Sequence, residues 1–86
     1  MKMNTIKERV VGIIENQIGR KITQIPDYSS IYLLGTEMNV KPRELVKIVV
    51  ELERIFQIQF TELDFLRKRM ETIDLMVDVI QDHLQY

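Results

Sequence analysis

The first apolar pattern along the chain is a stripe at helical spacing between Thr5 and about Ile18. Its members are Ile6, Val10, Ile13 and Ile14, widened by Val11 and Ile18. Such a stripe indicates an amphipathic helix with one buried face. We expect Asn4 or Thr5 to cap its start. Gly19 is expected to end it, because glycine accepts the left-handed backbone that closes many helices.

The next stretch, from Arg20 to Asn39, has no regular period. Pro26-Asp27 and Ser29-Ser30 are typical of turns. The stretch nevertheless holds more large apolar residues than a free linker would: Ile22, Ile25, Ile31, Leu33 and Leu34. We therefore expect a long connection folded back onto the core, with a short helical turn near Ser30–Leu34.

A second helical pattern covers about Val40 to Ile55. Its main stripe is Leu45, Ile48, Val49, Leu52 and Phe56. Pro42 suits a first turn, and Glu44 suits the third helical position of a capping box. Val46 and Val50 widen the apolar face. We favour their packing under the long connection, since apolar residues at helical spacing usually face the core; the alternative is an exposed contact for another protein.

Between Phe56 and Phe60 apolar and polar residues alternate as in a strand, but no second strand is at hand to pair with it. We interpret this segment as an extended connector. Thr61 is expected to cap a short helix that ends near Met70, with Asp64 at its third position and Phe60 facing Phe65. A last helix begins at Thr72, and its stripe is Ile73, Met76, Val77, Ile80 and Leu84.

The predicted fold class is therefore all-α: a four-helix bundle of three longer helices and one short helix, with a long loop between the first and second. The 86 residues suffice for a single domain, 1–86. Without cysteine the chain has no disulfide or thiolate chemistry. No apolar run approaches the roughly 18 residues that span a bilayer. A cytoplasmic protein without a membrane partner is the resulting expectation.

Catalysis and nucleic-acid binding find little support in the sequence. The net charge is −1, so no overall basic field attracts nucleic acid. His83 lies near Asp78 and Asp82, but a metal site needs three or four convergent ligands, and none is predicted. We interpret Arg67-Lys68-Arg69 as a surface run. No nucleophile motif or glycine-rich phosphate loop occurs, so we expect no enzyme.

The order and lengths of the helices resemble those of the acyl carrier proteins, and the likeness spans nearly the whole chain. Three stretches carry it: Thr5-Ile6-Lys7-Glu8-Arg9-Val10 through Gly19, Leu52-Glu53-Arg54-Ile55-Phe56, and Thr72-Ile73 to Val79-Ile80. In that family a serine in an Asp-Ser-Leu motif, at the start of the second helix, receives the phosphopantetheine arm. The resemblance implies the same four-helix fold for this chain.

That serine is missing here. Asn39 takes its place when the chain is aligned on Glu44-Leu45-Val46, and Met38 or Pro42 takes it in other registers. No serine follows Ser30, and an amide, a thioether or a proline ring cannot form the phosphodiester. We therefore expect no phosphopantetheine cofactor. In this respect the chain is similar to acyl-carrier-related proteins of bacterial peptide-maturation systems that lack the serine.

The second helix opens with Lys41, Arg43 and Lys47, where typical carriers are acidic. A cation at a helix N-terminus interacts unfavourably with the helix macrodipole, at a cost of roughly 0.3–1 kcal/mol. These cations therefore do not serve the stability of the fold. With Asn39, Val46 and Val50 they form our candidate partner-docking set; a solvated helix surface is the alternative for the cations.

We expect a protein-binding module for a biosynthetic or peptide-modifying enzyme. One alternative is a true carrier that uses Ser29, Ser30 or a non-covalent ligand. Another is a regulatory partner of an enzyme. We expect a monomer, with a homodimer through Val46 and Val50 as the competing hypothesis.

Overall fold

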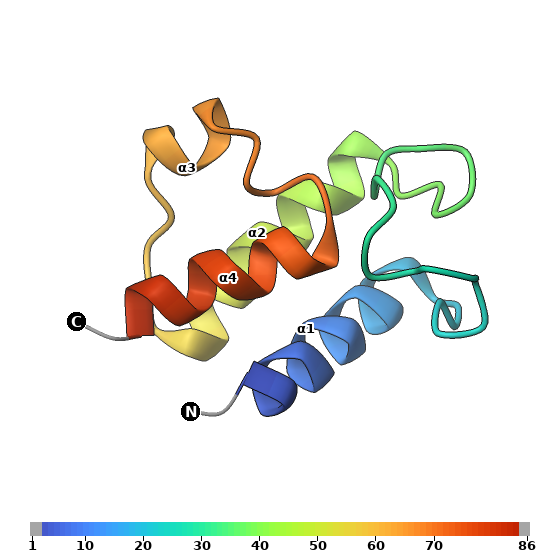
Figure 1. The fold of residues 1–86 in the computed structure, drawn as a ribbon, viewed down its shortest axis with the longest axis horizontal. Coiled ribbons are helices and arrows are strands. Elements are labelled where there is room, and N and C mark those ends of the chain that lie inside the picture. Colours follow the sequence, from blue (N-terminus) through green and yellow to red (C-terminus); the bar gives the residue numbers. More distant parts are fainter. Residues whose placement is uncertain (1–2, 85–86) are drawn as a thin grey trace.

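The computed structural model describes residues 3–84, which form four α-helices and no strand within that range. The helices are α1 (Met3–Ile18), α2 (Pro42–Phe56), α3 (Glu62–Leu66) and α4 (Ile73–Leu84). Figure 1 shows α1, α2 and α4 as the three long helices, with the short α3 set apart at the upper left. The all-helical fold class is thus confirmed, including the long connection between the first two helices.

Helix α1 begins at Met3, earlier than the sequence pattern predicts. Asn4 and Thr5 therefore lie inside its first turn, and the prediction that either residue caps the helix was wrong. Its end agrees with the prediction. Gly19 has φ 74°, and its N–H donates to the Glu15 carbonyl at 2.9 Å, so it closes the helix with the left-handed backbone that glycine adopts without strain.

The chain from Gly19 to Lys41 is a series of turns, and the predicted helical turn near Ser30–Leu34 does not form a helix. Hydrogen bonds hold this connection to the start of α4. The Leu33 N–H donates to the Glu71 carbonyl and the Asp74 N–H donates to the Ser29 carbonyl, both at 2.9 Å. These bonds satisfy backbone groups that would otherwise favour a local helical turn. The predicted folding back onto the core is confirmed, because Ile22 and Leu33 are fully buried.

Helix α2 starts close to its predicted position, with Pro42 as its first residue. The Glu44 carboxylate accepts a hydrogen bond from the Lys41 backbone N–H at 2.9 Å, which satisfies one of the free donors at the helix start. Val40 precedes the helix and is buried. At the other end Gln57 takes a left-handed conformation, and the extended connector predicted after Phe56 follows.

Helix α3 begins as predicted but ends earlier. Thr61 Oγ1 accepts from the Asp64 N–H at 3.2 Å, and the ring of Phe60 lies edge-on to Phe65, with 6.5 Å between ring centroids. The helix stops at Leu66 instead of near Met70. Lys68 has φ 57°, a left-handed conformation that cannot continue a right-handed helix.

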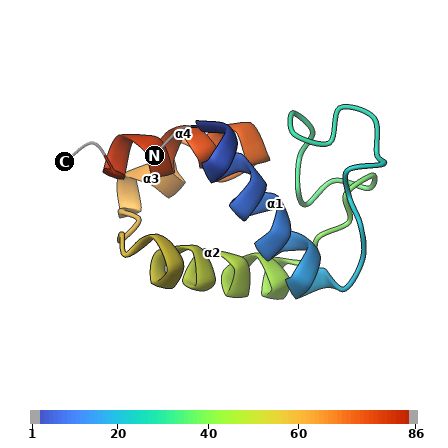
Figure 2. The ribbon, with the colours of Figure 1, turned by 90° about the horizontal axis from the view of Figure 1, so that it is seen from below.

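Helix α1 packs against both α2 and α4. Figure 2 shows α1 crossing between these two helices, with the connection beyond the C-terminal end of α1. Thr72 Oγ1 accepts from the Leu75 N–H at 3.1 Å and so caps α4. The core draws on α1, α2, α4 and the connection. Its fully buried large side chains include Ile6, Ile14, Ile22, Leu33, Met38, Ile48, Leu52, Ile73, Met76 and Ile80.

Candidate functional site

The predicted docking residues of α2 and of the chain just before it are all exposed. We call them the α2 face: Asn39, Lys41, Arg43, Val46, Lys47 and Val50. Val46 is 64% exposed and Val50 is 57% exposed. The favoured interpretation that these valines pack under the connection was therefore wrong. The connection instead reaches the core through Leu33, Met38 and Val40, and it lies beyond the N-terminal end of α2 (Figure 2).

The position of each residue around α2 follows from helical geometry. Successive residues are rotated by about 100° around the helix axis. From the core outward, three rows of two residues follow one another: Leu45 with Val49, Val46 with Val50, and Arg43 with Lys47. Only the first row is covered, at least in part, by the rest of the protein. The exposed surface therefore changes from apolar to basic around the helix.

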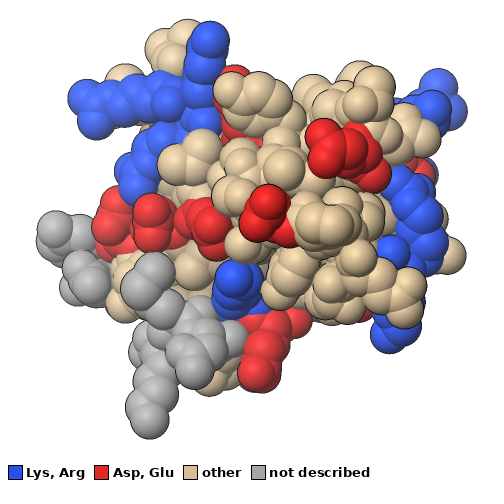
Figure 3. Space-filling model, turned by 45° about the vertical axis from the view of Figure 1, so that its right-hand side comes forward, with Lys and Arg blue, Asp and Glu red and all other residues tan. Residues whose placement is uncertain are grey.

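The cations of the α2 face have no carboxylate partner in the part of the chain that the structure describes. The side chains of Lys41, Arg43 and Lys47 form no ion pair within residues 5–84. Arg54, one turn beyond the face, is different because it pairs with Glu51. This contact lowers the pKa of Glu51 and raises that of Arg54. Figure 3, in which the connection is turned toward the viewer, shows lysine and arginine mostly at the two sides of the visible face, with chiefly acidic and uncharged side chains between them.

The three residues that the predicted resemblance aligns with the serine of acyl carrier proteins differ in their surroundings. The Met38 side chain is fully buried, whereas Asn39 and Pro42 are exposed. Asn39 has φ 50°, and the Arg20 guanidinium donates to the carbonyls of both Met38 and Asn39. Arg20, which follows the end of α1, thus holds the chain just before α2 in place.

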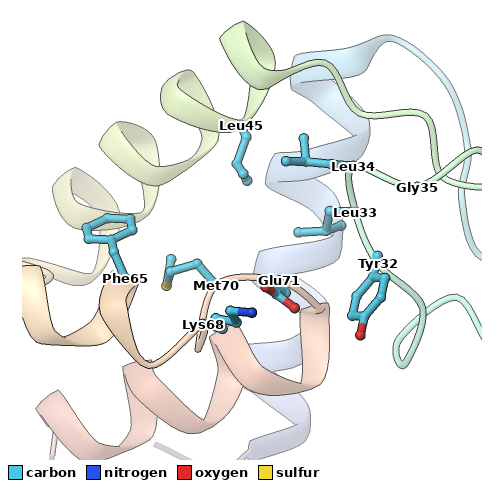
Figure 4. Close-up of a pocket in the computed structure, with 9 residues that line it drawn as sticks. All are labelled: Tyr32, Leu33, Leu34, Gly35, Leu45, Phe65, Lys68, Met70 and Glu71. Atoms are coloured by element: carbon cyan, nitrogen blue, oxygen red, sulfur yellow. The ribbon is translucent and has the colours of Figure 1, made fainter.

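An apolar groove of about 560 Å³ lies beside α2 (Figure 4). Its walls come from three stretches of chain: the connection, α2, and α3 together with the segment that leads on to α4. The lining residues are Tyr32, Leu33, Leu34, Gly35, Leu45, Phe65, Lys68, Met70 and Glu71. Figure 4 shows Leu45 pointing from α2 into the space between Leu34 and Phe65. The groove had no signal in the sequence, because the residues that form its walls are far apart along the chain.

Several polar side chains meet where α3 approaches the end of α4. The Asp64 carboxylate accepts from the Thr61 N–H at 2.9 Å and lies 3.0 Å from His83 Nε2. Arg69 lies 3.9 Å from Asp64 and 2.6 Å from Asp82. The sequence placed His83 near Asp78 and Asp82, but its contact is Asp64, 19 positions away. The Thr61–Asp64 capping box was visible in the sequence, whereas this distant contact had no local signal.

Burial raises the pKa of Asp64, but the hydrogen bonds with Thr61 and His83 lower it by more than burial raises it. The pKa of Asp64 therefore lies below its ordinary value. Asp64 is therefore an ionised acceptor that holds α3 to α4. Within residues 5–84 no group of three potential metal ligands converges. The alternative serines take part in turns: the Ser29 carbonyl accepts from the Asp74 N–H, and Ser30 Oγ donates to the Asp27 carbonyl at 3.2 Å.

Among the described helices, none has the length and apolar character needed to cross a membrane. No protein-family model matches the chain, and no curated protein matches it in sequence.

Proposed function

We propose that this protein is an acyl-carrier-like bundle that never carries a phosphopantetheine arm and that binds another protein through the α2 face. The observation that carries the proposal is the exposure of Val46 and Val50 beside three cations without carboxylate partners. The partner is an enzyme of a biosynthetic or peptide-maturation system in the cytoplasm. The protein itself is not an enzyme, and it acts as a monomer.

The exposed valines and the cations of the α2 face do not stabilise the isolated protein. Burying a valine side chain is worth about 1.5–3 kcal/mol, and here two valines remain largely in water. Lys41 and Arg43 stand at the start of α2, where a cation opposes the helix dipole by about 0.3–1 kcal/mol. Both features reduce the stability of the isolated fold and suit a surface that is covered by a partner.

The order of helices supports the likeness to acyl carrier proteins, and the residues before α2 support the loss of the carrier function. None of the three candidates for the serine position has a hydroxyl group. Met38, in addition, is enclosed in the core. A phosphopantetheine arm would have no hydroxyl group to attach to at any of these three positions.

Mass spectrometry tests the absence of the arm. The pure protein is incubated with a promiscuous phosphopantetheinyl transferase and coenzyme A, and a known carrier protein serves as the positive control. We expect no change in mass for this chain while the control gains the arm. A mass gain equal to the arm would refute the proposal, and peptide mapping would then show whether Ser29 or Ser30 holds it.

Photo-crosslinking tests the docking surface. A photoreactive amino acid replaces Val50 in one variant and Asp78, which is exposed on α4, in a second. After irradiation in cells of the native host, we expect the photoreactive residue at position 50 to form a crosslink to a protein other than this chain. We expect the one at position 78 to form no crosslink. Equal products from both positions, or a crosslinked dimer of this chain at position 50, would contradict the proposal.

The groove favours a second candidate function, the binding of a non-covalent apolar ligand. Leu34, Leu45, Phe65 and Met70 give it an apolar lining, and its volume of about 560 Å³ suits a small molecule. Native mass spectrometry of the protein isolated from its own host tests this function. A bound species that survives gel filtration supports it, whereas a bare protein mass speaks against it.

A further inference from the structure

We infer that the partner contributes an acidic amphipathic helix, which lies along the groove and over the outer rows of α2. This inference rests on the proposed function and specifies the chemistry of the partner. The apolar stripe of that helix covers the groove and the row of Val46 and Val50. Its carboxylates lie over Arg43 and Lys47.

The order of side chains around α2 supports this occupant. The groove wall at Leu45 is followed by the valine row and then by the row of Arg43 and Lys47. An amphipathic helix presents an apolar stripe flanked by polar residues, so its cross-section repeats the same order. Such a helix can cover the valines and bring acidic residues to the cations in a single docked position.

The opposite side of the groove also carries apolar and basic side chains. Phe65 lines the groove and is 48% exposed, and Lys68 also lines the groove. Arg67, at the end of α3, is exposed nearby in the chain. Glu71 is the one carboxylate among the nine lining residues. Cations therefore stand on both sides of an apolar middle, which favours an occupant with acidic residues on both flanks.

A second copy of this chain fits the surface less well. In a two-fold dimer the same patch meets itself, so Arg43 and Lys47 of one copy would approach the same cations of the other. An acidic partner pairs with them instead, and charge complementarity of this kind selects partners and speeds their encounter. Nucleic acid would also bring negative charge, but it would leave Val46 and Val50 without an apolar partner, because bases stack on aromatic rings and these two positions offer none.

Two synthetic helical peptides of about four turns serve as probes. Both carry leucine at positions i, i+3, i+4 and i+7; one has glutamate at the flanking positions and its twin has lysine. Fluorescence anisotropy gives the affinity of each. We expect the acidic peptide to bind at least about 10-fold more tightly at low salt, and the preference to shrink as salt screens the charges. Amide shifts of isotope-labelled protein should move along 43–50 and 32–35.

Charge reversal in the protein supplies the decisive control. A double variant with Arg43→Glu and Lys47→Glu should prefer the lysine peptide, whereas Arg9→Glu, an exposed reversal on α1, should keep the preference for the acidic one. Circular dichroism verifies that each variant is folded. A single-stranded oligonucleotide, tested in competition, distinguishes a nucleic-acid surface.

The inference is overturned by equal binding of the two peptides, by no binding of either, by amide shifts elsewhere, or by tighter binding of the oligonucleotide. These results leave the proposed function intact if crosslinking at position 50 still traps a protein. Failure of crosslinking together with selective peptide binding would instead count against the proposed function alone.

Discussion

At the scale of single residues, Asp64 joins two helices through one carboxylate. It completes the cap of α3 by accepting from Thr61, and it contacts His83 of α4 at 3.0 Å. The ring of His83 also lies edge-on to Phe60, with centroids 5.9 Å apart. Because α3 has only five residues, its position depends on these contacts more than on its own helical hydrogen bonds.

Replacing Asp64 with asparagine tests this role. We expect Asp64→Asn to lower the free energy of unfolding by about 1–2 kcal/mol near neutral pH, because the cap and the contact with His83 lose their charged acceptor. Since the pKa of Asp64 in the folded state lies below its ordinary value, the ionised form stabilises the fold. That contribution is complete above the ordinary pKa of about 4 and is lost as the pH falls through the lower folded value.

Urea unfolding at about pH 7 and about pH 3 measures the effect. The difference between the variant and the parent should shrink at the lower pH. Asp78→Asn, at an exposed position of α4, is the matched control and should change stability little at either pH. A difference for Asp64→Asn that persists unchanged in acid would contradict the assignment.

At the scale of elements, α2 serves both folding and the exposed surface. Its inner side supplies Ile48, Leu52 and Phe56 to the core, while its outer side exposes valines and cations. The start of the helix is stabilised by Glu44 but is opposed by Arg43, which stands beside it. Stability and the proposed docking therefore favour different residues in the same turn.

The variant Arg43→Glu tests whether Arg43 favours partner binding at the expense of stability. Glutamate in the first turn interacts favourably with the helix dipole, and it lies four residues before Lys47, the spacing of a helical ion pair. We expect the free energy of unfolding to rise by about 0.3–1 kcal/mol at low salt and the gain to fall at high salt. Partner capture by photo-crosslinking at position 50 should decrease in the same variant. A variant that is less stable, or that captures the partner as well as the parent does, would contradict this account.

The starts of α2, α3 and α4 were easier to predict than the start of α1, the end of α3 or the exposed face of α2. Pro42, Thr61 and Thr72 mark starts by local chemistry that is legible in the sequence. The end of α3 depends on a left-handed lysine, Lys68, and lysine carries no such signal. Val46 and Val50 were predicted to lie in the core because their helical spacing is typical of buried residues. Spacing alone does not show whether another segment covers them, and here they are exposed. The residues of the α2 face could thus be named from the sequence as candidates, whereas the groove and the contact of Asp64 with His83 required the fold.

At the scale of the whole molecule, the connection behaves as part of the core and not as a loop around it. Leu33 is fully buried, while the next residue, Leu34, is 53% exposed at the groove. The backbone of Leu33 donates to Glu71 and accepts from the Val40 N–H at 2.9 Å. Two neighbouring leucines therefore have different tasks, one in the core and one at the surface.

Alanine at each of these two positions should separate the tasks. Leu33→Ala should lower the free energy of unfolding by about 2–5 kcal/mol, as expected for a buried leucine. Leu34→Ala should change it by less than about 1 kcal/mol but should weaken the binding of the acidic peptide. Urea unfolding and anisotropy measure the two effects. Similar losses of stability in both variants would show that the connection does not divide its side chains in this way.

The groove is bounded by three stretches that are distant in sequence, so filling it would brace them against one another. A compound or peptide that enters it binds the folded chain and not the unfolded one, and mass action then raises the melting temperature. Thermal shift in a library screen would therefore detect an occupant of any chemical class.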